Sequence, residues 1–284
     1  MVPGRYRFVV APVLSVAADM VVPGAGGGGW VATVIHQVKA CLNGGRRPDE
    51  HSAVPVTAAA LAAAAVEAVA AGAEAVHLHP RDSSGAETLE RDHVAASVGA
   101  VRLACPGIPV GVTTGLWISG GDVGQRLAAV TGWAELPVAA RPDFASVNVA
   151  EAGFAELVEV LGGAGIGVEA GVWSTADALA LAASRTGGWT RILVEIIGGP
   201  AETALARADA VLGCLDEQGV PGLRLLHGEE AACWPLIAHA GRLRLPTRVG
   251  FEDTLLGPDG EPATNNADLV KQALAVWTGS APLR

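Results

Sequence analysis

Short runs of apolar and β-branched residues alternate with longer alanine- and leucine-rich segments from about residue 36 to the carboxyl end. The short runs are typical of strands buried on both faces, and the longer segments have the spacing of helices. This alternation predicts repeated βα units over a parallel sheet. The predicted strands are His36–Leu42, Ala75–His79, Pro109–Thr113, Phe144–Val149, Gly165–Glu169, Arg191–Ile196, Leu223–His227 and Thr247–Phe251.

A helical segment follows each of these strands. Thr57 stands where a helix cap is expected, as does Ser174 or Thr175 before Asp177, and Pro200 stands where a first helical turn tolerates proline. Eight units in about 250 residues predict a (β/α)8 TIM barrel, whose active site lies at the carboxyl ends of the strands. A doubly wound sheet fits less well, because no G-x-G-x-x-G follows the first strand. The predicted helices are Thr57–Ala71, Arg91–Ala104, Asp122–Trp133, Ala152–Leu161, Thr175–Ser184, Pro200–Glu217, Glu229–Ala240 and Asn266–Trp277.

Composition then narrows the class of protein. Half of the residues (50%) are hydrophobic and 17% are charged, so the chain can bury a large core and is not intrinsically disordered. The longest apolar stretch, 57–78, is mostly alanine and is interrupted by Glu67 and Glu74, so we expect no membrane span. A net charge of -10 argues against a nucleic-acid partner.

The first 34 residues stand apart from the repeated pattern and contain a glycine-rich tract at 24–29. We expect residues 1–34 to form a poorly ordered extension and residues 35–284 to form the catalytic barrel. An apolar run near the start looks like a signal peptide, but no A-x-A cleavage site follows it. The four cysteines lack C-x-x-C spacing, which favours buried thiols in a reducing compartment and predicts a cytoplasmic protein.

Polar residues gather at the predicted carboxyl ends of the strands, and the sharpest group is His77 and His79 in H-L-H-P-R-D. Residues at i and i+2 of a strand point to the same face, so both imidazoles can reach one metal ion. Glu252, after the last strand, would be a third ligand and would leave zinc an open position for a substrate oxygen. Two alternatives remain: one histidine is merely packed, or Glu252 and Asp253 cap a loop and pair with Arg248.

Several stretches of the chain, taken together, resemble the β-keto acid cleavage enzymes, a family named for 3-keto-5-aminohexanoate cleavage enzyme. The resemblance extends from about His36 to the carboxyl end. H-x-H-x-R-D and R-x-G-x-E-D-T are specific in combination, although neither is specific alone. The matching stretches are 40–46, 54–57, 77–82, 111–115, 146–148, 168–173 and 248–254.

The resemblance implies a zinc-dependent acyltransferase, with one zinc ion per subunit and a homotetrameric assembly. Such an enzyme exchanges an acyl group between a β-keto acid and acetyl-CoA, and it gives acetoacetate, or acetoacetyl-CoA, together with a new CoA ester. The expected site residues are the metal ligands His77, His79 and Glu252, the catalytic residues Asp253, Arg248 and Glu169, and the substrate-binding residues Thr113, Thr114, Asn148 and Arg46.

The chemistry asks for residues of these types. Zinc can polarise the β-keto oxygen and stabilise an enolate. A carboxylate such as Asp253 can remove or relay the proton, while Arg248 offers a fork for a substrate carboxylate and keeps Asp253 ionised. The residues alone do not choose between Asp253, Glu169 and Glu195 as the base.

Two departures from the family argue against an amino-bearing substrate. Arg46 and Arg47 stand where some members carry an acid, and Val149 stands where a hydroxyl residue can follow the strand-four asparagine. Arg46 therefore suggests a keto diacid as substrate. The alternative is that Arg46 forms a surface salt bridge with Asp49 or Glu50.

Two other functions compete with acyl exchange. A zinc hydrolase of the amidohydrolase type also places His-x-His at the end of a barrel strand, but it needs further histidines where strands five and six carry Glu169 and Glu195. A non-catalytic, metal-binding barrel predicts bound zinc without turnover that depends on acetyl-CoA.

Overall fold

The computed structural model describes residues 21–22, 30–31, 34–184 and 186–280, and the chain divides into two compact units, 1–32 and 33–284. In the first unit, β1 (Val21–Val22) pairs antiparallel with β2 (Trp30–Val31). Most of the predicted extension, 1–34, lies outside the described residues, and its order stays a prediction. The predicted boundary of the catalytic barrel likewise stays a prediction.

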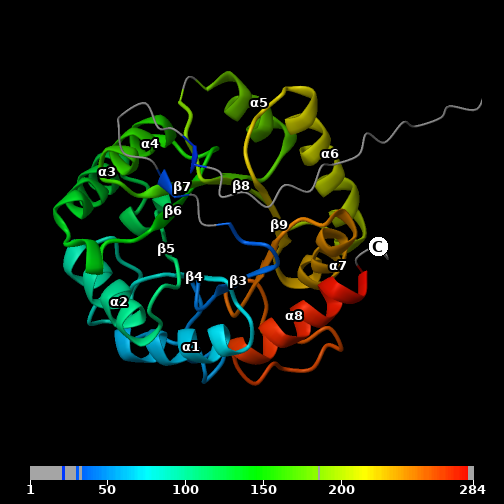
Figure 1. Ribbon diagram of the computed structural model, residues 1–284, viewed down its shortest axis with the longest axis horizontal. Coiled ribbons are helices and arrows are strands. Elements are labelled where there is room, and N and C mark those ends of the chain that lie inside the picture. The colour runs from blue at the N-terminus through cyan, green and yellow to red at the C-terminus, as the bar shows by residue number, and fades with distance from the viewer. Residues whose placement is uncertain (1–20, 23–29, 32–33, 185, 281–284) are drawn as a thin grey trace, which may run out of the picture. The chain divides into compact units, whose positions relative to one another are not determined.

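Eight parallel strands form the sheet of the second unit and confirm the predicted TIM barrel. Figure 1 shows the strands at the centre and the helices outside them. The strand order is β10-β3-β4-β5-β6-β7-β8-β9. Leu226 N–H, in β9, donates to Pro246 O next to β10 at 3.0 Å, so the barrel is nearly closed. The strands are β3 (Val38–Cys41), β4 (Ala75–Leu78), β5 (Val110–Thr113), β6 (Phe144–Asn148), β7 (Gly167–Val172), β8 (Arg191–Ile196), β9 (Arg224–Gly228) and β10 (Thr247–Val249).

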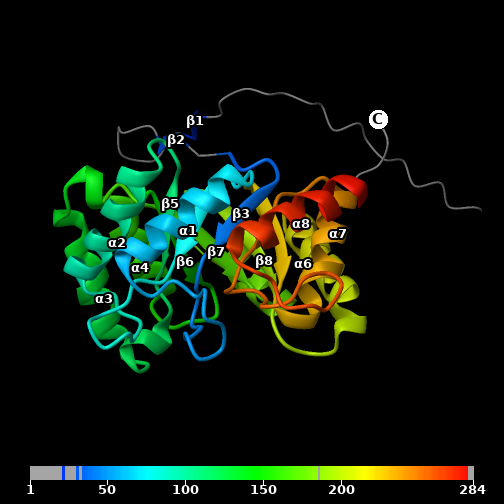
Figure 2. The same ribbon diagram turned by 90° about the horizontal axis from the view of Figure 1, so that it is seen from below.

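Helices surround the strands, and Figures 1 and 2 show them as an outer layer around the sheet. Thr57 Oγ1 accepts from Ala60 N at 3.1 Å, which confirms the predicted cap. The helix predicted from Pro200 begins instead with a 3₁₀ turn at Ala201–Thr203. None of the described helices combines the length and hydropathy needed to cross a bilayer. The helices are α1 (Ala58–Ala70), α2 (Arg91–Ala104), α3 (Val123–Thr131), α4 (Phe154–Gly163), α5 (Thr175–Ala183), α6 (Ala204–Glu217), α7 (Cys233–Leu243) and α8 (Asn266–Ser280).

The core explains the high apolar content. Nearly every strand residue is buried, because one face lines the barrel interior and the other supports the helices. The first helix, α1, buries Leu61, Ala65 and Ala68. The small side chains of the two alanines let the helix lie close to the strands.

Most strands begin or end one or two residues away from the predicted range, and the largest difference is in β7. The strand predicted at Gly165–Glu169 is β7, which runs from Gly167 to Val172, so Glu169 lies inside the strand rather than at its carboxyl end. The charged residue does not end the strand, because Lys39 and Arg191 from other strands pair with it inside the barrel. The apolar residues after Glu169 can therefore continue the strand.

Candidate active site

Two histidines and a glutamate meet at the carboxyl ends of the strands. His77 is the third residue of β4, His79 directly follows that strand, and Glu252 lies beyond β10. Glu252 Oε2 lies 3.7 Å from His77 Nε2 and 3.6 Å from His79 Nε2. Ligand atoms of the three residues all lie within 4.8 Å of one another. The structure therefore brings the three predicted metal ligands together.

The loop after β3 holds this group in place. Asn43 donates from Nδ2 to His79 O and accepts from His79 N, both at 2.9 Å. Gly44 passes against Glu252: a Cβ on Gly44 would lie 2.5 Å from Glu252 Cγ, and its φ of +51° favours glycine. Arg81 donates from Nη2 to Gly44 O. The N-G-G and H-x-H-x-R-D motifs thus fix the backbone on both sides of the site.

The donor set fits a zinc ion. Glu252 Oε2 is buried and makes no hydrogen bond to the described residues, although it faces two imidazole nitrogens. Zinc binds nitrogen and oxygen ligands at about 2.0–2.2 Å, so two ligand atoms of a tetrahedral site lie about 3.3–3.6 Å apart. The observed separations of 3.6 and 3.7 Å are close to that spacing. Three protein ligands leave a fourth position open, as in catalytic zinc sites.

Arg248, in β10, joins this group to Asp253. Its Nη2 lies 2.9 Å from Glu252 Oε1 and 2.8 Å from Asp253 Oδ1, and its Nε donates to Asp253 Oδ1 at 3.0 Å. The pairing with Arg248 that was weighed as an alternative is therefore present, but it engages only one oxygen of Glu252 and one oxygen of Asp253. The second oxygen of Glu252 faces the imidazoles. Asp253 Oδ2 is buried and makes no hydrogen bond to the described residues.

Glu195 and His227 lie on the other side of Arg248. Arg248 Nε donates to His227 Nδ1 at 3.1 Å, so the proton of a neutral His227 is on Nε2, which lies 2.9 Å from Glu195 Oε2. Trp173 donates to the second oxygen of Glu195 at 3.3 Å. Burial raises the pKa of Glu195, but His227 and Arg248 outweigh it and hold that pKa below its ordinary value. Both oxygens of Glu195 are thus engaged, whereas Asp253 has only Oδ1 engaged among the described residues.

The metal-ligand residues differ in their pKa values. Burial lowers the pKa of His77 well below its ordinary value. Burial acts in the same direction on His79, but the carboxylates of Glu252 and Glu87 outweigh it and raise the pKa of His79 to about 9. Burial also opposes the charge of Glu252, yet Arg248 and the two histidines hold its pKa well below the usual range. Without a metal ion, His77 is therefore neutral at neutral pH, while His79 is protonated, and a metal ion that binds here would have to displace that proton.

Glu169, the third predicted catalytic residue, lies away from these ligands. Its Oε2 lies 2.5 Å from Lys39 Nζ and its Oε1 lies 3.1 Å from Arg191 Nε. Both cations lie over the ring of Phe144, at 5.5 Å for Lys39 Nζ and 5.4 Å for Arg191 Cζ. Arg191 and Phe144 are the first residues of β8 and β6, so this group sits toward the amino ends of the strands. A catalytic role for Glu169 stays a prediction.

The predicted substrate-binding residues of β5 and β6 are buried at the ends of their strands. Thr113 Oγ1 accepts from Gly115 N at 3.1 Å, and Thr114 Oγ1 donates to Ser146 O at 2.6 Å. Asn148 donates from Nδ2 to a nearby carboxylate, that of Glu151, at 2.9 Å. These contacts fix the loops beyond β5 and β6, and a substrate role for the three residues stays a prediction.

Arg46 is engaged with protein groups. Its guanidinium pairs with Glu50 at 3.1 Å and with Glu230, and Nε donates to Phe251 O at 3.1 Å. The surface salt bridge weighed as an alternative is thus present for Glu50, whereas Asp49 pairs with Arg47. The keto-diacid preference stays a prediction.

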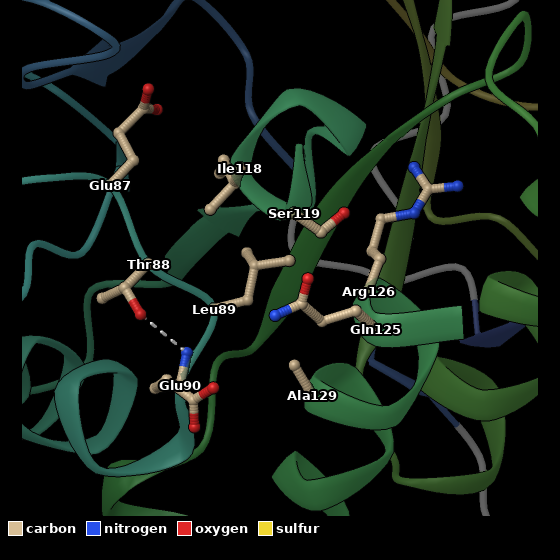
Figure 3. Close-up of a pocket in the computed structure, with 9 residues that line it drawn as sticks. All are labelled: Glu87, Thr88, Leu89, Glu90, Ile118, Ser119, Gln125, Arg126 and Ala129. Carbon is tan, nitrogen blue, oxygen red and sulfur yellow. Dashed lines mark hydrogen bonds between the residues drawn. The ribbon is translucent and has the colours of Figure 1, made fainter. Parts of the chain in front are cut away.

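Two residues of this region escaped sequence reasoning, Lys39 and Glu87. No periodic pattern marks either one: Lys39 meets Glu169 only in the folded barrel, and Glu87 reaches His79 through a short hairpin. Glu87 also borders a cavity of about 120 Å³, shown in Figure 3, with its carboxylate turned away from Leu89 and Gln125. That volume is below the roughly 300–1,000 Å³ of ordinary ligand pockets, so we assign the cavity no ligand.

Comparison with known families gives one match over most of the chain. The family model described as beta-keto acid cleavage enzyme matches residues 36–279. A 3-keto-5-aminohexanoate cleavage enzyme from Fusobacterium nucleatum is 33% identical over 79 residues. That match covers 28% of this chain and 29% of the relative.

Solved structures share the fold at low identity. ObcA, in a ternary complex with a C4-CoA adduct and oxalate, has a TM-score of 0.67 and 16% identity, and the match covers 80% of this chain and 64% of ObcA. A 3-dehydroquinate dehydratase from Geobacillus kaustophilus has a TM-score of 0.57 and 11% identity, with 86% and 93% covered. These likenesses show the barrel fold alone.

Proposed function

The chain belongs to the beta-keto acid cleavage enzyme family, and from that premise we propose that it exchanges an acyl group between a β-keto acid and acetyl-CoA with one bound zinc ion. The products are acetoacetate and a new CoA ester that carries the acyl group of the substrate. The main support is the buried Glu252 Oε2 that faces two imidazoles beside Asp253, whose Oδ1 is held by Arg248. The C4-CoA adduct in the ObcA structure agrees with a CoA-bearing co-substrate.

The protein groups divide the first step between them. Bound zinc supplies Lewis acidity toward the β-keto oxygen. Asp253 takes a proton at Oδ2 from the carbon between the ketone and the carboxylate, since Oδ2 is the oxygen without a hydrogen-bond partner among the described residues. Arg248 holds Oδ1 through two N–H groups and thereby favours the ionised form of Asp253.

The remaining steps balance in atoms and electrons. The deprotonated carbon attacks the acetyl-CoA carbonyl, a new C–C bond forms and the CoA thiolate leaves. The thiolate attacks the original keto carbon, and the older C–C bond breaks. The proton returns from Asp253 to the departing acetoacetate carbon, and the acyl group leaves as a CoA ester. No oxidant or reductant is needed.

The substrate-binding residues and the assembly are part of the same proposal. Thr113, Thr114 and Asn148 line the substrate side of the site, Glu169 is an acid beneath it, and Arg46 selects a keto diacid. The proposed assembly is a homotetramer. The molar mass from light scattering would test it.

Isotope transfer tests the reaction. The zinc-loaded protein is incubated with acetyl-CoA labelled with ¹³C in the acetyl group and with a panel of keto diacids and amino-bearing β-keto acids. We expect the label in acetoacetate, and an unlabelled CoA ester of the substrate's acyl group, both read by mass spectrometry. Label that stays in acetyl-CoA with every substrate would contradict acyl exchange.

The same assay separates the competing functions. A hydrolase of the amidohydrolase type turns over its substrate without acetyl-CoA and forms no new CoA ester. A non-catalytic barrel binds zinc and leaves both reactants unchanged. A clear preference for the amino-bearing acids would remove the role assigned to Arg46 while leaving the reaction intact.

A further inference from the structure

The carboxylate of Glu87 is shared between a metal-ligand histidine and a tryptophan. Glu87 Oε1 lies 2.5 Å from His79 Nδ1, and Glu87 Oε2 accepts from Trp117 Nε1 at 3.1 Å. The ring of Trp117 stacks on the ring of His79, with centroids 6.3 Å apart and planes at 29°. Glu87, Trp117 and the predicted metal ligand His79 thus form a closed group of three side chains, in which each contacts the other two.

A short hairpin fixes the position of Glu87. Arg81 and Glu87 pair as an antiparallel bridge, and Asp82 N donates to Ala86 O at 2.9 Å. The Asp82 carboxylate also accepts from Ser84 N and Ala86 N. Because this hairpin begins two residues after His79, the backbone holds Glu87 directly beside the imidazole.

Trp117 is held from the other side. It lies in the 3₁₀ helix η1 (Leu116–Ser119), and its ring packs so closely on Gly115 that a Cβ there would overlap the ring. Half of Trp117 (50%) is exposed. A large indole that is half exposed and still hydrogen-bonded to a carboxylate has a defined orientation, and its ring lies beside that of His79.

We propose that Glu87 and Trp117 are positioning residues that set the geometry and the proton position of His79 for metal binding. With a proton on Nδ1 directed at Glu87, the Nε2 lone pair points at Glu252 and is free for the metal. A carboxylate that accepts from the distal nitrogen of a metal-bound histidine also raises the basicity of the ligand nitrogen. Loss of such a partner typically costs about 10- to 100-fold in metal affinity.

The inference rests on the metal site of the proposed function, so it is tested by metal affinity rather than by turnover. Zinc affinity of the full chain is measured by competition with a chromophoric chelator for the native protein and for Glu87→Gln, Glu87→Ala and Trp117→Phe. We expect a loss of about 10- to 100-fold for both Glu87 variants and a loss of only a few fold for Trp117→Phe, which keeps a ring over His79. Glu90→Gln is the matched control, because Glu90 lies three residues along the same segment and has no contact with His79 among those that the structure gives.

A second readout separates positioning from folding. Thermal unfolding of Glu87→Gln in the presence of chelator should stay close to that of the native protein, since the amide has the shape of the carboxylate and its oxygen can still accept from Trp117. Zinc should also change the fluorescence assigned to Trp117, taken as the native signal minus that of Trp117→Phe. Native zinc affinity in both Glu87 variants, or a drop that only follows lost thermal stability, would overturn the inference. Zinc binding that depends on Glu87 without acyl exchange would sink the proposed function and leave the inference intact.

Discussion

The barrel holds two buried clusters of charge that are built from similar residues and differ in how they are paired. The inner cluster is Lys39, Glu169 and Arg191, and the mouth cluster is His77, His79, Arg248, Glu252 and Asp253. In the inner cluster each Glu169 oxygen faces a cation, at 2.5 and 3.1 Å. In the mouth cluster Glu252 Oε2 faces two imidazole nitrogens at 3.6 and 3.7 Å, and Asp253 Oδ2 makes no hydrogen bond to the described residues.

The difference separates structure from chemistry. A buried carboxylate is costly unless protein groups or a ligand compensate its charge. Glu169 receives that compensation from its own chain. Glu252 has one oxygen held by Arg248 and one directed at two imidazoles, which is an arrangement that a divalent cation completes. The pattern of pairing, rather than the presence of charge, is why we propose the mouth cluster as the reactive one.

The largest expected effect comes from removing the ligand that completes the mouth cluster. Glu252→Ala deletes one of three metal donors, so we expect loss of bound zinc and a fall in acyl exchange of about 10⁴-fold, equivalent to roughly 5 kcal/mol of lost Lewis-acid stabilisation. Metal analysis measures the bound zinc, and the isotope assay measures the rate of acyl exchange. The exposed Glu261→Ala is the control, and full activity in Glu252→Ala would remove Glu252 from the mechanism.

A smaller effect is expected where zinc stays and proton transfer is lost. Asp253→Asn keeps the shape of the side chain but removes the base, so kcat should fall by about 10³-fold, within the range for general base catalysis. Zinc content should remain at the native level. The exposed Asp259→Asn is the matched control, and an unchanged kcat would transfer the role of base to another acid.

A substitution in the inner cluster should lower the free energy of unfolding rather than the zinc content. Lys39→Met leaves Glu169 with one of its two cations, and breaking a buried pair costs about 3–5 kcal/mol. Urea denaturation should show this loss in the free energy of unfolding, while the zinc stoichiometry stays at the native value. Lys271→Met makes the same change on the exposed face of α8 and should cost little. Loss of zinc in Lys39→Met, with the fold intact, would break the distinction between the clusters.

The smallest effect is expected at the rim, where Glu229 lies 4.0 Å from Arg248 and keeps 29% of its side chain exposed. Burial raises the pKa of Glu229 to about 7, with Asp253 and Glu252 adding to the rise and Arg248 and His227 opposing it. A raised folded-state pKa means that the contribution of Glu229 to stability is present below about pH 4.5 and is lost as the pH rises through about 7.

Glu229→Gln should therefore stabilise the chelator-treated protein slightly at pH 8 and not at pH 4. Urea midpoints at the two pH values measure the difference, with Glu261→Gln as the exposed control. An equal effect of Glu229→Gln at both pH values would contradict the raised pKa.

The fold follows from the sequence because its signals are local. Alternating buried strands and alanine-rich helices mark each βα unit, and a cap such as Thr57 marks a helix start within one residue. His77 and His79 were found for the same reason, since a two-residue period places both on one face of β4. Glu252 followed from the rule that strand ends meet at one mouth.

The remaining residues depend on long-range pairing, which no local pattern encodes. Glu169 lies inside β7 rather than at its end because two cations compensate its charge, and these lie 130 and 22 residues away along the chain. Glu87 reaches His79 only because a hairpin turns the chain back. The cations that pair with Glu169 come close to it only when the folded barrel brings β3, β7 and β8 around one interior.

The central claim is that the mouth cluster, and not the inner cluster, holds one divalent cation. The most direct measurement is the zinc content per chain, by inductively coupled plasma mass spectrometry, of the native protein, Glu252→Ala and Lys39→Met after dialysis against dilute zinc. The account predicts about one zinc ion per chain in the native protein and in Lys39→Met, and almost none in Glu252→Ala. Native protein without zinc, or zinc retained in full by Glu252→Ala, would contradict it.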